Sequence, residues 1–336
     1  MVKNRQEEST MADRGRPACE ICFNPPRGIT ADVDAVALKA LRNDAADTEF
    51  VAPQRLDFHL IIIVTSGSAQ HTVDFMTYPL TERTVLWIRP GQLQQWGNLH
   101  ECEGWALLIG PTALTTNLKT YLDQYSRDRT HRRLNEHGWP VLLDAIDSLV
   151  TIGEHSRRPA SPVHHCTLRH MLAVIILVLS CSMADHEPLA APSSDVFLRF
   201  RQVVEANYAR SRTVGNYAAM LGYSSRTLTR ACLAATGRTA KQFIDDRILL
   251  EAKRLLADTA EPVGTIGRRL GFEDTSNFSR FFTKRAGRQP LEFRRFRQAE
   301  ARESEWLAGK PGTAPRSAAN ALHVSNEKVP RLRPSL

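Results

Sequence analysis

The sequence of 336 residues lacks the patterns of a secreted, membrane-spanning or metal-dependent protein. Its six cysteines follow no disulfide framework, and the single pair Cys19 and Cys22 lacks the second pair of a typical zinc site, so metal or redox chemistry there is a minor alternative. The polar, acidic N-terminus is not that of a signal peptide. The longest apolar run, 171–179, is too short to span a bilayer. We therefore expect a cytoplasmic protein without a membrane partner.

What the chain does contain is a pattern written twice near its C-terminal end. Leu228, Arg230, Gly237 and Phe243 correspond to Phe278, Arg280, Gly287 and Phe293 at a constant offset of 50. In each copy a short helix ends at a glycine suited to a left-handed turn, and a good N-cap residue, Ser224 or Asp274, opens a second helix. This is the plan of a helix-turn-helix, whose second helix enters the major groove of DNA.

The second helix of each copy has a buried face and a polar face. Leu228 and Phe278 belong to the buried faces, and a helix over 240–258 is expected to hold the two units rigidly, with recognition helices about 34 Å apart. Arg suits bidentate contact with guanine and Asn suits adenine. Arg230 and Arg280 could instead be solvated or ion-paired, Thr229 and Ser279 could be ordinary surface residues, and Thr275 and Ser276 could touch phosphate only.

The segment 195–297 resembles the DNA-binding domain of the AraC/XylS family of transcription regulators. The resemblance lies in Gly271-Phe272-Glu273-Asp274, Asn277-Phe278-Ser279-Arg280-Phe281-Phe282, Gly287, Pro290 and Phe293-Arg294, which are close to the family signature. It implies that DNA is contacted by Arg226, Thr229 and Arg230 from the first unit and by Thr275, Ser276, Asn277, Ser279 and Arg280 from the second.

Basic charge is concentrated in the same segment. Residues 195–298 contain 20 Lys or Arg and 10 Asp or Glu, a net +10, whereas the whole chain has +8 and the remainder therefore −2. Such an excess on one domain is what electrostatic attraction to DNA phosphates requires.

The N-terminal half reads as short strands punctuated by Gly, Pro and Ser, at 58–65, 70–75, 84–88 and 105–109. Their order and motifs resemble the cupin-like sensor barrel common in the same family. A metal-binding barrel of this kind needs a His-x-His cluster, but His71 stands alone and Gln94 takes the approximate place of the later histidine, so we expect no metal. Inward-facing residues that could bind an effector are His59, Gln70, Trp87 and Trp96; equally, they could be barrel core or surface.

Helices are predicted after the strands, at 114–125, 139–152 and 162–183. The last is apolar on all sides, a pattern typical of a buried helix. In the family such helices often pair between subunits, so we expect a homodimer. The segment 185–194 reads as a linker, and 1–20 and 299–336 as disordered tails.

The predicted fold class is α+β: an antiparallel cupin-like barrel with trailing helices over 21–184, then an all-α DNA-binding domain over 195–298 with two helix-turn-helix units joined by a long helix. The predicted function is a sequence-specific transcription regulator that binds double-stranded DNA, takes a small-molecule effector and, if it is an activator, contacts RNA polymerase. We predict no catalytic residue and no cofactor. The alternatives are a barrel enzyme with an appended DNA-binding module, and a DNA-binding protein without an effector.

Overall fold

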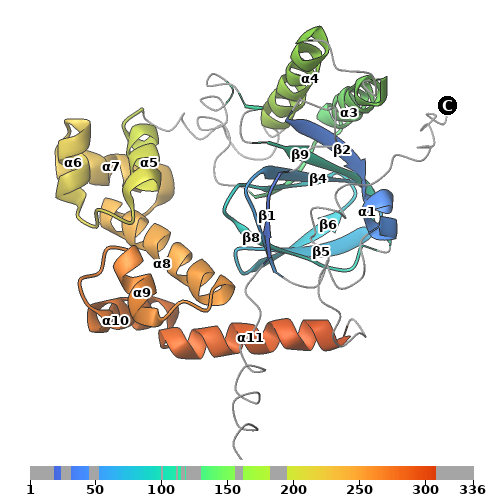
Figure 1. The fold of residues 1–336 in the computed structure, drawn as a ribbon. Helices are drawn as coiled ribbons and strands as arrows, with labels where there is room; N and C mark the ends of the chain where they lie inside the picture. The colour runs from blue at the N-terminus through green and yellow to red at the C-terminus, as the bar shows by residue number, and fades with distance from the viewer. Residues whose placement is uncertain are drawn as a thin grey trace, which may run out of the picture. The chain divides into compact units, whose positions relative to one another are not determined.

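The computed structural model describes residues 19–23, 32–44, 53–99, 101–110, 113–114, 118, 130–155, 162–181 and 195–307. They divide into two compact units, one within residues 19–189 and the other within 190–307 (Figure 1). The first unit is built on strands and the second is entirely helical, which confirms the predicted fold class. The predicted linker 185–194 and most of the two predicted tails lie outside the described residues.

Two five-stranded sheets form the first unit. All strand pairs are antiparallel except β1 with β3. In spatial order, one sheet contains β1 (Cys19–Ile21), β3 (Gln54–Leu56), β8 (Leu93–Trp96), β5 (Ser68–Val73) and β6 (Met76–Thr81), and the other contains β10 (His131–Arg133), β7 (Thr84–Ile88), β4 (His59–Ser66), β9 (Glu103–Ile109) and β2 (Val33–Ala37).

The central strand β4 is buried on both of its faces, which explains its unbroken apolar run. Leu60, Ile62 and Val64 face the interior between the two sheets, where they pack with residues such as Leu56. Ile61 and the side chains that alternate with these face the opposite way and belong to a second core. The sheet that contains β4 therefore separates two apolar layers.

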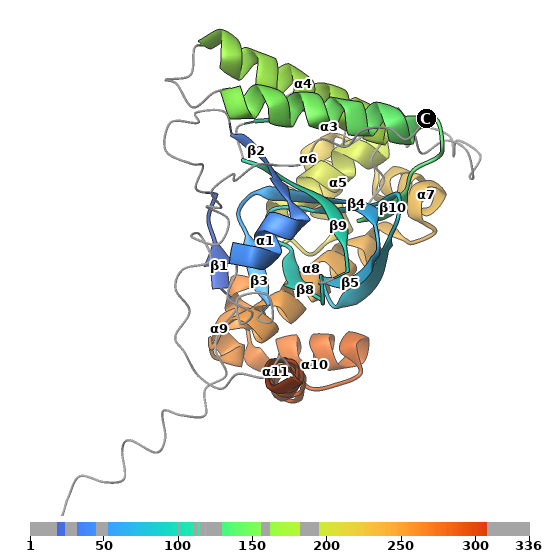
Figure 2. The same cartoon turned by 90° about the vertical axis from the view of Figure 1, so that its right-hand side faces the viewer.

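The second core is covered by α3 (Gly138–His155) and α4 (Pro162–Cys181), which lie side by side over this sheet (Figures 1 and 2). Leu168, Leu172 and Ile176 form part of the buried stripe of α4. The expectation that this helix is buried all round is wrong, because Val174 and Leu177 are 42% and 41% exposed.

By length and composition alone, the window Val163–Ser180 of α4 would suffice to cross a membrane, with a mean hydropathy of 1.5. This differs from the expectation drawn from the shorter run 171–179. Only 28% of the window is buried. The buried stripe of α4 rests on the sheet, and the rest of the helix remains exposed.

Two further differences from the expected pattern occur in this unit. A short helix, α1 (Leu38–Asp44), interrupts the strand-rich region, and its Leu38 and Leu41 are buried one helical turn apart. The predicted helix 114–125 lies mostly outside the described residues, although Leu114 and Leu118 pack in the second core.

The second unit consists of helices packed around one apolar core. The long helix between the repeats is α8 (Ala240–Asp258), which confirms its predicted bounds. The last helix, α11, continues to Leu307, so the chain is helical beyond Gln298, where the domain was expected to end. The remaining helices are α5 (Asp195–Asn207), α6 (Val214–Leu221), α7 (Ser225–Thr236), α9 (Val263–Arg269), α10 (Thr275–Ala286) and α11 (Pro290–Leu307).

Candidate nucleic-acid interface

The two predicted helix-turn-helix units are α6 with α7 and α9 with α10, and the turn begins with an equivalent hydrogen bond in both, although the second turn has one more residue before the N-cap of its recognition helix. The amide of Tyr223 donates to the carbonyl of Ala218 at 3.0 Å, and that of Phe272 donates to Gly267 at 2.9 Å. Small residues are needed at these two carbonyls because the helices cross there: a Cβ on Gly267 would lie only 3.0 Å from Phe278 Cβ.

The recognition helices α7 and α10 also begin and end alike. The Ser224 hydroxyl accepts from the Thr227 amide at 3.1 Å, and the Asp274 carboxylate accepts from the Asn277 amide at 2.7 Å, as N-caps do. Gly237 and Gly287 end the helices with φ of 71° and 72°, the left-handed conformation that glycine tolerates best. Both recognition helices are therefore capped in the same way at each end.

In the first helix-turn-helix, α6 with α7, the side chains predicted to contact DNA lie away from the core. Leu228 and Cys232 are fully buried, whereas Arg226 and Arg230 are exposed and Thr229 is half-buried. Within the described residues, neither arginine forms an ion pair or hydrogen bond. Both guanidinium groups therefore remain available to an anionic partner, and the alternative of an intramolecular salt bridge receives no support.

The second helix-turn-helix, α9 with α10, presents a larger polar surface. Ser276 and Arg280 are exposed and Ser279 is half-buried, while Phe278, Phe281 and Phe282 anchor α10 in the core. The described residues supply Arg280 with no ionic partner.

Two of the predicted contacts in this unit also touch the protein itself. Asn277 is exposed, but its side-chain amide donates to the carboxylate of Asp274. Thr275 lies against α9, since a Cβ on Gly264 would meet its hydroxyl oxygen at 2.8 Å. Base contact by Asn277 would thus compete with its bond to the cap.

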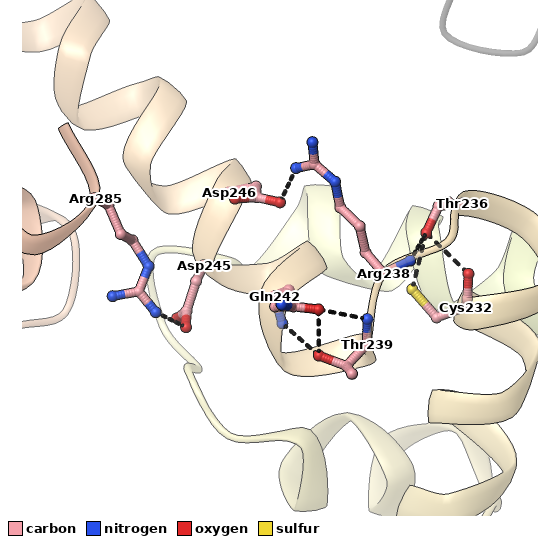
Figure 3. A network of polar contacts seen from close by, with 8 residues as sticks. All are labelled: Cys232, Thr236, Arg238, Thr239, Gln242, Asp245, Asp246 and Arg285. Atoms are coloured by element: carbon pink, nitrogen blue, oxygen red, sulfur yellow. Dashed lines mark hydrogen bonds and ion pairs between the residues drawn. The ribbon is translucent and has the colours of Figure 1, made fainter.

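The scaffold behind α10 contains polar contacts that were not expected from the sequence. A capping box begins α8: the Gln242 amide donates to the Thr239 hydroxyl at 3.2 Å, and the Thr239 amide donates to Gln242 Oε1 at 2.9 Å. One turn later, the buried Asp245 pairs with Arg285 near the end of α10 (Figure 3). The sequence signal for Asp245 was weak, since two adjacent aspartates on a helix suggest a solvated face.

Of the four residues expected to point into the barrel, only Trp96 does so. Gln70 is exposed. Trp87 belongs to the core beneath α3 and α4, on the outer face of its sheet, and its indole N–H donates to His59 Nδ1 at 3.2 Å. The inward placement of His59, Gln70 and Trp87 was therefore wrong, because the alternation of each strand places its neighbours inside instead.

The polar residues that do enter the barrel are His71, Gln94 and Gln54. The three lie on neighbouring strands β5, β8 and β3, and each is at most 5% exposed. The amide of Gln94 donates to Gln54 Oε1, and the ring of His71 packs edge-on against Trp96 with centroids 4.8 Å apart. Gln94 Oε1 and both ring nitrogens of His71 have no hydrogen-bond partner among the described residues.

Burial dominates the protonation of His71. Loss of water lowers its pKa from 6.5 to about 3, although the neighbouring Gln94 amide acts in the opposite direction. The ring is therefore neutral near pH 7 and presents one N–H donor and one acceptor to the barrel interior. Such unpaired polar atoms inside an apolar barrel are costly unless a water or ligand satisfies them.

The chain matches two known domain families. Residues 36–149 match the model of an AraC-like ligand binding domain, and residues 217–295 match that of a helix-turn-helix domain. Among similar proteins, the HTH-type transcriptional activator RhaR of Mannheimia succiniciproducens is 23% identical over 242 residues, covering 71% of this chain and 86% of that protein. RhaS of Enterobacter sp. strain 638, also an HTH-type transcriptional activator, is 27% identical over 249 residues, covering 72% and 87%.

Solved structures give weaker likenesses. ToxT from Vibrio cholerae is 14% identical with a TM-score of 0.38, covering 72% of this chain and 91% of that one. The C-terminal domain of AraT, a response regulator from Geobacillus stearothermophilus, is 26% identical with a TM-score of 0.30, covering 31% and 87%. TM-scores of this size do not establish a common fold, so the domain assignment depends on the sequence matches.

The neutral His71 makes the stability of the strand-built N-terminal unit depend on pH. The unfolded chain takes up a proton below pH 6.5 and the folded barrel does not, so stability decreases as pH falls from 6.5 toward 3. Between pH 6.5 and 5 we expect a loss of about 2 kcal/mol from this residue. Urea unfolding followed by tryptophan fluorescence measures it, since four of the five tryptophans are in this half of the chain. His71→Phe should remove that part of the slope; an unchanged slope would contradict the assignment.

The exposed arginines of α7 and α10 should read bases rather than only attract phosphates. Arg230→Ala or Arg280→Ala is expected to cost about 1–3 kcal/mol at a cognate site and to relax the preference at one base position. Arg268→Ala is the matched control, because it removes the same charge from an exposed site on α9. Competition binding with single-base variants measures both effects. An equal loss on every DNA sequence would show phosphate contact alone.

Proposed function

The chain belongs to the AraC/XylS family of DNA-binding transcription regulators, and on that basis we propose that each subunit reads a bipartite DNA site with two recognition helices. α7 and α10 enter successive major-groove segments, and α8 holds them apart. The residues that contact DNA are Arg226, Thr229 and Arg230 on α7 and Thr275, Ser276, Asn277, Ser279 and Arg280 on α10.

The observation that carries this proposal is the equivalence of the two units. Their turns begin with an equivalent hydrogen bond, the N-caps and C-caps of their recognition helices match, and Arg230 and Arg280 are exposed at corresponding positions. Two such surfaces in a segment with a net charge of +10 suit a long anionic partner with a repeating groove.

We further propose that the barrel binds a small uncharged effector through His71 and Gln94. A neutral histidine and the Gln94 amide offer both donor and acceptor positions, and the other described residues that share the inner face of these strands, Gln54, Leu56, Val73 and Trp96, are uncharged. The facing wall, with Leu60, Ile62 and Leu86, is apolar. An effector with hydroxyl or amide groups on one side and an apolar surface on the other would satisfy both. Its binding would shift the population between two arrangements of the protein.

The subunits are proposed to pair through α3 and α4. Val141, Val174 and Leu177 are 51%, 42% and 41% exposed on these helices, and pairing would remove them from water. We propose a cytoplasmic homodimer without membrane contact, which would also contact RNA polymerase if it is an activator. Sedimentation of the full chain would contradict pairing if it showed only monomers at micromolar concentration.

A barrel enzyme with an attached DNA-binding module is the rival function. No group of three or more His, Cys, Asp or Glu suited to a metal ion exists among the residues that the structure describes. His71 has a low pKa and no acidic partner within the described residues, so it is poorly suited to accept a proton near pH 7. The proposal therefore assigns the protein no catalytic activity.

Selection of binding sites from a random DNA pool, at a stated salt concentration, tests the proposed function. Enrichment of two base blocks about one helical turn apart is the expected result. A direct or inverted repetition of that pair would report the arrangement of the dimer. A single enriched block would mean that one helix alone reads bases. No enrichment, with or without candidate effectors, would contradict sequence-specific binding.

The effector proposal makes a separate prediction for the barrel. In a panel of neutral hydroxylated and amide compounds, an effector should raise the free energy of unfolding of the N-terminal unit by about 2.7 kcal/mol at a hundredfold excess over its dissociation constant, seen as a higher urea midpoint. Gln94→Leu should abolish this shift. Gln95→Leu is the control, because Gln95 is the next residue on β8 and points to the other face. Equal shifts in both variants would contradict binding at Gln94.

A further inference from the structure

Asp245 of α8 is an acidic side chain only 1% exposed, in a domain whose surface is basic. Its Oδ1 accepts from Lys241 Nζ at 2.6 Å, and its Oδ2 accepts from Arg285 near the C-terminal end of α10 (Figure 3). A buried carboxylate is strongly unfavourable unless it is paired in this way, and removing one partner leaves the other charge uncompensated. The pair therefore ties α8 to the second recognition helix.

Contacts continue from Lys241 toward the first helix-turn-helix unit. Its ammonium group also donates to the carbonyl of Arg212, just before α6, at 3.1 Å. The Arg212 guanidinium lies 3.7 Å from the centroid of the Phe272 ring, in the turn of the second unit. Arg285 itself lies over Phe281 of α10, at 4.4 Å. These contacts join both units around one carboxylate.

The backbones of the two units also approach closely at this junction. Gly271, in the turn of the second unit, has φ +77°, and a Cβ there would lie 2.6 Å from the carbonyl oxygen of Ala209. The corresponding Gly222 of the first unit has φ +69° but nothing within 4 Å of such a Cβ. The second helix-turn-helix is therefore packed directly against the loop that precedes the first.

We propose that Asp245 is a positioning residue that fixes the orientation of α10 relative to α7, and so sets the spacing between the two base blocks that the protein accepts. This rests on the proposed reading of two blocks. Without the carboxylate, Arg285 loses its anchor to α8, and the cations of Arg212 and Arg285 repel each other across the vacated anionic position. The helices themselves remain folded, because they are packed around a shared apolar core that does not include Asp245.

The spacing of DNA blocks is a sensitive measure of this orientation. One base pair inserted between them moves the second block by about 3.4 Å along the duplex and rotates it by about 35°. A rigid pair of recognition helices cannot follow such a change. A pair released at the α8–α10 contact can follow it in part, at some loss of affinity for the original spacing.

The experiment compares the full-length wild type with Asp245→Asn on three duplexes: the selected site, and that site with one base pair inserted or deleted between its blocks. The wild type is expected to lose on the order of 100-fold in affinity when the spacing changes, and Asp245→Asn less than about tenfold. Asp246→Asn is the matched control. Asp246 is the next residue of α8 and pairs with the exposed Arg238, so the same charge is removed without touching α10 (Figure 3). It should keep the spacing dependence of the wild type.

Circular dichroism checks that each variant is folded at the assay temperature. Should Asp245→Asn not fold, Arg285→Gln removes the same ion pair from its half-buried partner and should show the same relaxed spacing. Equal losses of all three proteins across the three duplexes would overturn the inference and leave two-block reading intact. Enrichment of one block only in the selection would instead overturn the proposed reading, and this inference with it.

Discussion

The arrangement of the DNA-binding surface depends on the packing of α8 between the two helix-turn-helix units. Ile244, Ile248 and Ala252 are fully buried, and polar residues of the same helix are buried beside them. Because α8 has little contact with water, its charges must be neutralised within the protein, as Glu251 is by Arg247 and Arg254. Apolar packing thus places the helix, and the ion pairs determine the angle at which its neighbours meet it.

The two helix-turn-helix units share caps and buried positions, and their outward surfaces can still differ. The caps and the turn require particular residues, so Ser224 and Asp274, or Gly237 and Gly287, recur at equivalent positions. The outward positions carry no such requirement, and some of them differ between the copies, as Arg226 and Ser276 do, although Arg230 and Arg280 are the same. Asn277 shows that the two sets overlap, since its side chain is bonded to the cap that also orders its backbone.

In the strand-built N-terminal unit, the sheet that contains β4 is buried on both faces and divides the apolar residues between two cores. Leu60 and Ile62 belong to the barrel interior, whereas Ile61 and Trp87 belong to the layer beneath α3 and α4. A residue in this sheet can therefore be buried without facing the barrel. The polar group of His71, Gln94 and Gln54 lies on the other sheet, whose inner face is where an effector would meet hydrogen-bonding groups.

The sequence by itself determined the two helix-turn-helix units and the helix between them, because capping residues, glycines and periodic apolar residues are local signals: the bounds of α8 and the caps of α7 and α10 followed from them, whereas α5 and α11 were not predicted. It determined four strands of the barrel, β4, β5, β7 and β9, but not the direction of their side chains. A strand buried on both faces, such as β4 or β7, has no polar alternation to show which face is inside. β5 does alternate between exposed and buried residues, but Gln70 and His71 are both polar, so only the structure, with His71 paired to Trp96 and on the same face as Val73, identified the inner one. The role of Asp245 likewise required the tertiary structure, since Arg285 lies 40 residues away in the chain. Long-range pairing of this kind leaves no periodic trace in a single sequence.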